Sequence, residues 1–220
     1  MLRLVKGKYI LPLALMVVFA LSRIPGMLPQ NFSAAYALAF CAGVYFSGGM
    51  AWWLPLTTLV LTDLGLNFYY YQFGFDVFQF SNLISQLFNY VAYVCLILLG
   101  RGFRPSSSFL RLLSGGIVGA LLFYLITNTA SWFFNPFQNP EYTRTLNGWI
   151  TALTVGTSGW PETWKFLWRT LLSGGIFTGL FVGAMKWTTA SESAREKELA
   201  NAPADQPDEK EAPEGAGEKA

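Results

Sequence analysis

Apolar residues occur in long runs that are separated by short segments rich in polar residues, Gly and Pro. A bilayer core about 30 Å thick needs about 20 apolar residues in a helix that rises about 1.5 Å per residue. The sequence therefore predicts six membrane-spanning helices, over about residues 9–28, 33–50, 52–70, 80–99, 109–127 and 165–187. A weaker apolar stretch over 146–155 is too short to cross and is expected to be interfacial or re-entrant.

The composition supports a membrane protein, because 53% of the 220 residues are hydrophobic and 13% are charged. An average soluble domain carries about 25% charged residues. We therefore expect an all-α fold, a six-helix transmembrane bundle formed by one domain over residues 1–187. Residues 188–220 combine Ala, Glu, Lys, Pro and Gly and contain no aromatic residue, a composition that predicts a disordered, charged, cytoplasmic tail.

Lysine and arginine are distributed unevenly over the segments between the predicted helices. Cytoplasmic loops carry an excess of these residues. An even number of crossings places most of them on one side: Arg3, Lys6, Lys8, Arg101, Arg104, Arg111, Lys186, Arg195 and Lys197. The opposite side holds Arg23, Arg144, Lys165 and Arg169. The sequence therefore predicts a multi-pass protein of the bacterial inner membrane with both termini cytoplasmic.

An alternative interpretation of the N-terminus is a cleaved signal peptide. Basic residues up to Lys8 precede the apolar run 9–21, and Ala20 and Ser22 are the small residues before the cut. Cleavage would leave five spans and would break the charge arrangement described above, so six spans are favoured.

The residue types exclude several kinds of catalytic and metal site. The chain has no histidine, which removes imidazole bases and histidine metal ligands. Its cysteines, Cys41 and Cys95, lie in different apolar runs and are expected to be packing residues. No phosphate-binding glycine loop or nucleophile elbow occurs. We therefore expect no enzyme activity, cofactor, metal or nucleic-acid partner; a membrane-embedded enzyme that depends on Asp63 is the least favoured interpretation.

Asp63 is an acidic residue placed near the middle of a predicted span. An ionised carboxylate there is costly unless it is paired, hydrogen-bonded, hydrated or protonated, so Asp63 is a functional candidate. Asn67 follows one helical turn later on the same face. Two roles remain open for Asp63, a structural hydrogen bond to a neighbouring helix and direct handling of a ligand or proton.

Polar side chains also recur at helical spacing in the run 80–99. Such a stripe must face protein or a wet cavity rather than acyl chains. Asn31 and Asn128 are expected near the outer end of this stripe, and Arg169 is expected to pair with Asp63 or an anionic substrate. The predicted substrate-binding residues are Asn31, Asp63, Asn67, Asn82, Gln86, Asn89, Asn128 and Arg169. The alternative to substrate binding is that these residues form only hydrogen bonds between helices.

Small residues four positions apart mark possible helix interfaces, because they let helix backbones approach closely in lipid. Three stripes are formed by Ala35, Ala39, Gly43 and Ser47, by Gly115 and Gly119, and by Gly175, Gly179 and Gly183. Packing within the chain is favoured, and docking of another membrane protein is the alternative. The hexapeptide 112–117 recurs identically at 171–176, which is compatible with an inverted repeat of the kind found in transporters.

Several motifs resemble an uncharacterised family of bacterial membrane proteins described as transport proteins. These motifs are Asn31-Phe32-Ser33 with 35–46, Leu54-Pro55-Leu56 with Thr62-Asp63-Leu64-Gly65, Thr127-Asn128 with Trp132, and Trp168-Arg169-Thr170-Leu171. That family is distantly similar to the substrate-binding S components of energy-coupling factor (ECF) vitamin transporters, including the cobalamin transporter BtuM. The resemblance implies an S-component-like six-helix fold with a substrate site near the outer face.

Two functions from different classes are consistent with these features. The leading hypothesis is a substrate-binding membrane transport component for uptake of a small molecule such as a vitamin. It would work in the lipid bilayer, with an ECF energy-coupling module as a possible partner. The alternative is a non-transporting membrane scaffold or assembly protein that binds partners through the small-residue stripes and the acidic tail.

Overall fold

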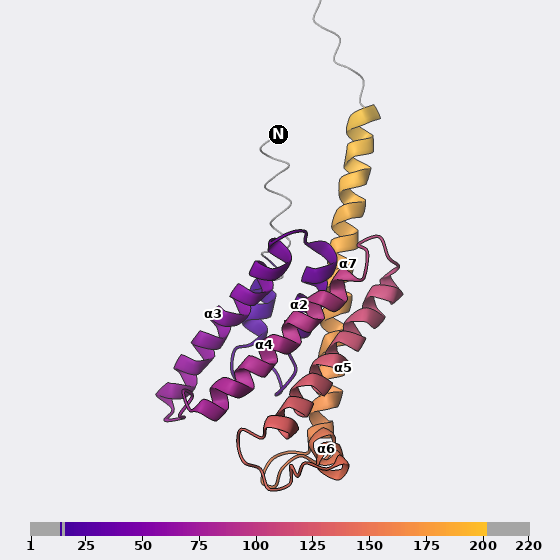
Figure 1. The fold of residues 1–220 in the computed structure, drawn as a ribbon. Helices are drawn as coiled ribbons and strands as arrows, with labels where there is room; N and C mark the ends of the chain where they lie inside the picture. The colour runs from indigo at the N-terminus through magenta and orange to yellow at the C-terminus, as the bar shows by residue number, and fades with distance from the viewer. Residues whose placement is uncertain (1–13, 15, 202–220) are drawn as a thin grey trace, which may run out of the picture. The chain divides into compact units, whose positions relative to one another are not determined.

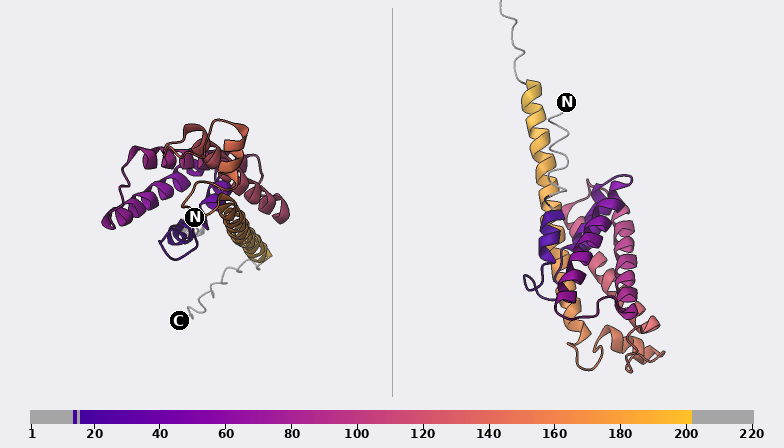
Figure 2. Two further views of the ribbon diagram at one scale, coloured as in Figure 1. Left: turned by 90° about the horizontal axis from the view of Figure 1, so that it is seen from below. Right: turned by 90° about the vertical axis from the view of Figure 1, so that its left-hand side faces the viewer.

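The computed structural model describes residue 14 and residues 16–201, and all regular structure within them is helical (Figure 1). After a helical segment over residues 16–22, the helices are α2 (Ala35–Tyr45), α3 (Met50–Gln72), α4 (Phe80–Arg101), α5 (Phe109–Phe134), α6 (Leu146–Leu153) and α7 (Thr163–Asn201). The long helices run up and down along a roughly common direction (Figure 2). The predicted all-α class is therefore confirmed.

Three of the described helices are long and apolar enough to cross a membrane, namely α4, α5 and the part of α7 from Thr163 to Ala194. They correspond to predicted spans 80–99, 109–127 and 165–187. The third predicted span forms α3, which is long but carries Thr, Asp and Asn residues along its length. Residues 9–13 and 15 of predicted span 9–28 lie outside the described residues; the span is helical over residues 16–22, which include Ala20 and Ser22, and then turns.

The second predicted span, 33–50, differs most from the structure. Its helix, α2, contains 11 residues, which give a length of about 17 Å and leave it too short to cross a bilayer core alone. Nearly every residue of α2 is buried, and the helix packs against α3, α4 and α5. An all-apolar helix is typical both of a membrane span and of a core surrounded by other helices. Here the apolar run reflects the core position.

Close backbone contact joins α2 to α4. A Cβ atom added to Gly43 would collide with the carbonyl oxygen of Ile97, and one added to Gly100 would collide with that of Phe40. On α5, Gly115 lies against the rings of Phe40 and Phe103. Small residues let backbones approach this closely. The stripe that contains Gly43 therefore packs within the chain.

The two copies of the repeated hexapeptide meet where α5 and α7 cross. A Cβ atom added to Gly116 would collide with Thr178, and one added to Gly174 would lie 2.5 Å from the Cβ atom of Ala120. Gly175 and Gly179 face Ile117 and Leu113 of α5. Both copies thus contribute to one interface, and these glycines are used in packing within the chain.

Basic residues of separate segments gather at one end of the helices. Lys186 Nζ donates to the carbonyl oxygen of Ser107 at 2.7 Å, which places this part of α7 beside the α4–α5 connection. That connection follows Arg101 and contains Arg104. The α2–α3 connection lies at the same end, whereas the α3–α4 connection and α6 lie at the other (Figure 1).

The end of α7 differs from the predicted disordered tail. The helix continues to Asn201, so residues 188–201 are helical, and from Trp187 onward they belong to a separate compact unit. The reason is local: this segment is rich in Ala, Glu, Lys and Arg, which have high helix propensities. Residues 202–220 of the predicted tail lie outside the described residues.

Candidate functional site

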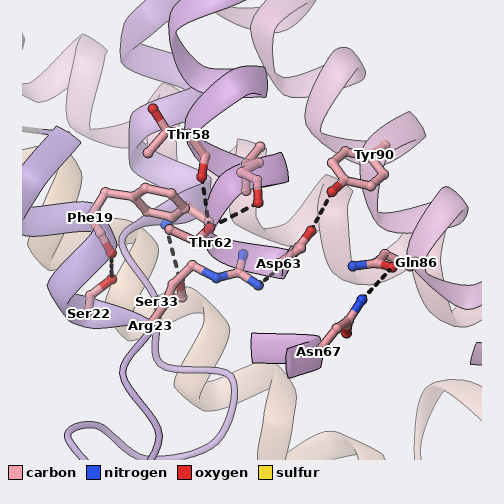
Figure 3. A network of polar contacts seen from close by, with 12 residues as sticks. Phe19, Ser22, Arg23, Ser33, Thr58, Thr62, Asp63, Asn67, Gln86 and Tyr90 are labelled. Carbon is pink, nitrogen blue, oxygen red and sulfur yellow. Dashed lines mark hydrogen bonds and ion pairs between the residues drawn. The ribbon is translucent and has the colours of Figure 1, made fainter. Parts of the chain in front are cut away.

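Asp63 of α3 lies between an arginine from the N-terminal segment and a tyrosine from α4 (Figure 3). Arg23 Nη2 forms an ion pair with Asp63 Oδ1, and the Tyr90 hydroxyl donates to Asp63 Oδ2 at 2.6 Å. The side chains of Arg23 and Asp63 are 17% and 12% exposed. Both carboxylate oxygens are therefore occupied, and the carboxylate links three segments that are distant in sequence.

The end of the N-terminal helical segment positions Arg23. Ser22 Oγ donates to the carbonyl oxygen of Phe19 at 2.7 Å and accepts from the backbone N–H of Ala34 at 3.3 Å. These bonds connect the two ends of the 23–33 segment. The Arg23 guanidinium also lies 5.7 Å from the centre of the Phe19 ring. The arginine is thus held against α3 by local contacts as well as by charge.

Asp63 pairs with Arg23, so the predicted pairing of Arg169 with Asp63 was wrong, whereas its pairing with an anionic substrate stays a prediction. No ion pair among the described residues includes Arg169. Sequence spacing gave no sign of Tyr90, which lies one residue beyond Asn89 in the predicted polar stripe. The sequence feature that could have identified Arg23 is its position as an isolated cation at the outer end of the first predicted span. This position is predicted to lie in the same half of the bilayer as Asp63.

Asn67 and Gln86 form a second polar contact between α3 and α4. Asn67 Nδ2 lies 3.5 Å from Gln86 Oε1, one helical turn from the Asp63 pair on each helix. This contact agrees with interhelical hydrogen bonding, the alternative considered for these residues. Neither side chain is among those that line the two polar cavities described below.

A cavity of about 590 Å³, here called the Arg23 cavity, lies beside the ion pair. Its lining includes Arg23, Asn31 and Asn89, together with the aromatic residues Tyr36, Tyr70, Tyr93, Phe123, Trp160 and Phe166. Small-molecule sites commonly have volumes of about 300–1,000 Å³ and a largely apolar wall with a few polar groups. Asp63 is not among the lining residues, but Arg23, its ion-pair partner, is.

A second cavity of about 420 Å³ contains the remaining predicted amides, Asn82 and Asn128. Asn82 Nδ2 donates to the carbonyl oxygen of Asp76, and Asn128 Nδ2 donates to that of Tyr124, each at 2.8 Å. Trp160 and Phe166 line both cavities. Apart from Arg169, which lines neither cavity, the predicted polar set therefore divides into two neighbouring cavities and the α3–α4 contacts. Among the described residues, no group of three or more Cys, Asp or Glu side chains offers a metal site.

The loops that border the second cavity are joined through Glu141. Its Oε1 accepts from the backbone N–H of Ser158 at 3.0 Å, which connects the α5–α6 and α6–α7 segments. The Ser158 side chain and backbone lower the pKa of the Glu141 carboxyl below its usual value through hydrogen bonding. A lowered folded-state pKa means that the ionised form is the one that stabilises this contact.

We predict that this loop contact weakens in acid. Its stabilisation is fully present above the unfolded-state pKa of Glu141 and is lost as the pH falls through the lower folded-state pKa. Glu141→Gln should therefore speed hydrogen exchange around Ser158 at neutral pH and have no effect in strong acid, after correction for intrinsic exchange rates. An equal difference between variant and parent at every pH would contradict this role.

Residues 4–197 match the family described as "Family of unknown function (DUF6580)". The matched range includes Arg23, Asp63 and Tyr90 and all the residues that line the two cavities. No curated protein and no solved structure matches the chain. Because the match covers most of the sequence, the chain belongs to the DUF6580 family.

Proposed function

We propose that the protein is a membrane transport component that binds a small molecule for uptake, with the Arg23 cavity as its substrate site. The observation that carries this proposal is the cavity of about 590 Å³, in which a guanidinium and three side-chain amides, those of Gln30, Asn31 and Asn89, accompany several aromatic rings. A helix that packs only against lipid and other helices does not require such polar groups at a cavity wall. Their convergence is typical of a ligand site.

The position of the cavity suits uptake. Its lining residues Tyr70, Trp160 and Phe166 belong to the later turns of α3 and to the region where α7 begins. These segments lie at the end opposite the α4–α5 connection (Figure 1). Since basic connections face the cytoplasm, the cavity opens outward in a bacterial inner membrane. In this proposal α2 and the 23–34 segment together make one pass, and six passes leave both termini cytoplasmic.

The proposal predicts that the purified protein binds a metabolite. Native mass spectrometry should detect a bound small molecule, and a thermal-shift screen of vitamins and metabolites should identify stabilising compounds. Asn89→Ala should weaken binding by about tenfold, because it removes hydrogen bonds to the ligand. The matched control is Asn147→Ala on α6, which is exposed and outside the cavity. If the protein carries no ligand and the screen yields no compound, the proposed function is wrong.

An energised uptake process would require a partner, and an ECF coupling module is the partner that we propose. Scaffolding is the competing function. The contacts of Gly43 and Gly115 within the chain favour transport, because they use small residues of the stripes that a scaffold would present to another protein. Crosslinking in native membranes separates the two: captured coupling ATPases support transport, and capture of an unrelated complex supports scaffolding.

A further inference from the structure

The charges around the Arg23 cavity are already balanced without a ligand. Among the described residues that line the cavity, only Arg23 is charged. Its guanidinium is paired with Asp63, which lies behind the wall. An anionic ligand would have to compete with Asp63 for Arg23, and a cationic ligand would meet the guanidinium without a facing carboxylate. A buried net charge without a partner is strongly unfavourable.

Several hydrogen-bonding groups on the cavity wall nevertheless lack a partner within the described residues. Tyr93 is 6% exposed and lines the cavity, yet its hydroxyl makes no hydrogen bond to any described residue. The same holds for Nη1 of Arg23 and for the side-chain amides of Asn31 and Asn89. None of these polar atoms is fully buried, so each is accessible from the cavity. These groups can donate to and accept from a polar ligand.

Several aromatic side chains that line the cavity pack against one another. The Tyr36 and Phe123 ring centres lie 4.8 Å apart, and those of Tyr93 and Phe123 lie 4.9 Å apart, so the three rings form one packed group at the wall. Trp160 is 74% exposed at the rim. Flat aromatic walls stabilise planar ligands through stacked or edge-to-face contact.

We infer that the Arg23 cavity takes an uncharged, planar molecule whose edge carries amide-like hydrogen-bond acceptors and donors, and that the hydroxyl of Tyr93 bonds to that edge. The acceptor side of the ligand faces Nη1 of Arg23, which can only donate. The two asparagine amides serve groups of either kind. This inference rests on the proposed function and specifies the substrate class of the same site.

Three compounds of nearly the same shape test the inference. Benzamide is uncharged, benzoate is an anion and the benzamidinium ion is a cation at neutral pH. Equilibrium binding to the full-length protein in detergent is measured for each compound, up to its solubility limit. We expect benzamide to bind most tightly, and Tyr93→Phe to weaken it by about threefold to tenfold, because one hydrogen bond is lost.

The matched control is Tyr45→Phe. The Tyr45 hydroxyl likewise has no partner among the described residues, but Tyr45 does not line the Arg23 cavity. Removal of this hydroxyl should leave binding unchanged. Tightest binding of benzoate or benzamidinium, no binding of benzamide, or equal effects of the two variants would overturn the inference. The proposed function would survive each of these results if the metabolite screen still yields a ligand, and it fails separately if that screen is empty.

Discussion

Replacing Asp63 with Ala should destabilise the protein by about 3 kcal/mol or more. The change leaves the largely buried Arg23 guanidinium unpaired and removes the acceptor of the Tyr90 hydroxyl, and breaking one side of a buried ion pair typically costs about 3–5 kcal/mol. Detergent-solubilised protein unfolded with increasing denaturant measures the loss. Because Arg23 would no longer be held at the cavity wall, ligand affinity should fall in the same variant.

A double-mutant cycle separates the ion pair from general damage at this position. Replacing both charges in Arg23→Gln/Asp63→Asn leaves no unpaired charge, so this variant should be more stable than either single variant. The matched control is the exposed pair of Lys165 and Glu162, whose atoms lie 2.7 Å apart. Its disruption should change stability by less than about 1 kcal/mol. Additive effects of the Arg23 and Asp63 changes would contradict the coupling.

Substituting Val for Gly43 should destabilise the protein by about 3 kcal/mol or more. The new side chain would be driven into the carbonyl oxygen of Ile97, and a backbone atom of α4 cannot move aside as a flexible side chain would. Overpacking of a core typically costs about 1–3 kcal/mol when side chains can adjust. Unfolding of the variant in detergent, together with loss of the monodisperse peak in size-exclusion chromatography, measures the effect.

Gly65→Ala is the control for this prediction. Gly65 lies inside α3, and a Cβ atom there would meet no described atom within 4 Å. Alanine is favoured over glycine in a helix by about 1 kcal/mol, so this substitution should leave stability unchanged or raise it. Equal destabilisation by Gly43→Val and Gly65→Ala would show that the two positions are limited by helix conformation rather than by the approach of α2 to α4.

Sequence periodicity predicted the long helices well, because run length and charged ends define a span independently of tertiary contacts. The predicted run 80–99 matches α4 to within two residues, and the run 109–127 has the correct start for α5, which continues to Phe134. The same signal misjudged α2, because hydropathy does not distinguish a helix surrounded by lipid from one surrounded by other helices. The length of the helix distinguishes the two cases. Helix α2 ends before Gly48 and Gly49, and an average hydropathy over the run conceals this glycine pair.

The candidate site was predicted in part for a similar reason. Asp63 stood out because an isolated carboxylate in an apolar run is rare. The identity of its partner, Arg23, depends on how the 23–33 segment folds back onto α3. Helical periodicity does not describe the path of such a non-helical segment. The predicted amides were polar residues in the correct helices, but their division between two cavities and interhelical contacts depends on helix rotation. Rotation is set by packing at glycines such as Gly43 and Gly116.

The Arg23–Asp63 pair also has a consequence for biogenesis. The two residues are 40 positions apart, so at a synthesis rate of about 5–20 residues per second Arg23 leaves the ribosome about two to eight seconds before Asp63. In the proposed six-pass arrangement, an arginine at membrane depth that lacks its carboxylate partner is disfavoured by a few kcal/mol during that interval. The first helix is therefore expected to remain at the translocon until α3 arrives, so that both charges enter the bilayer together.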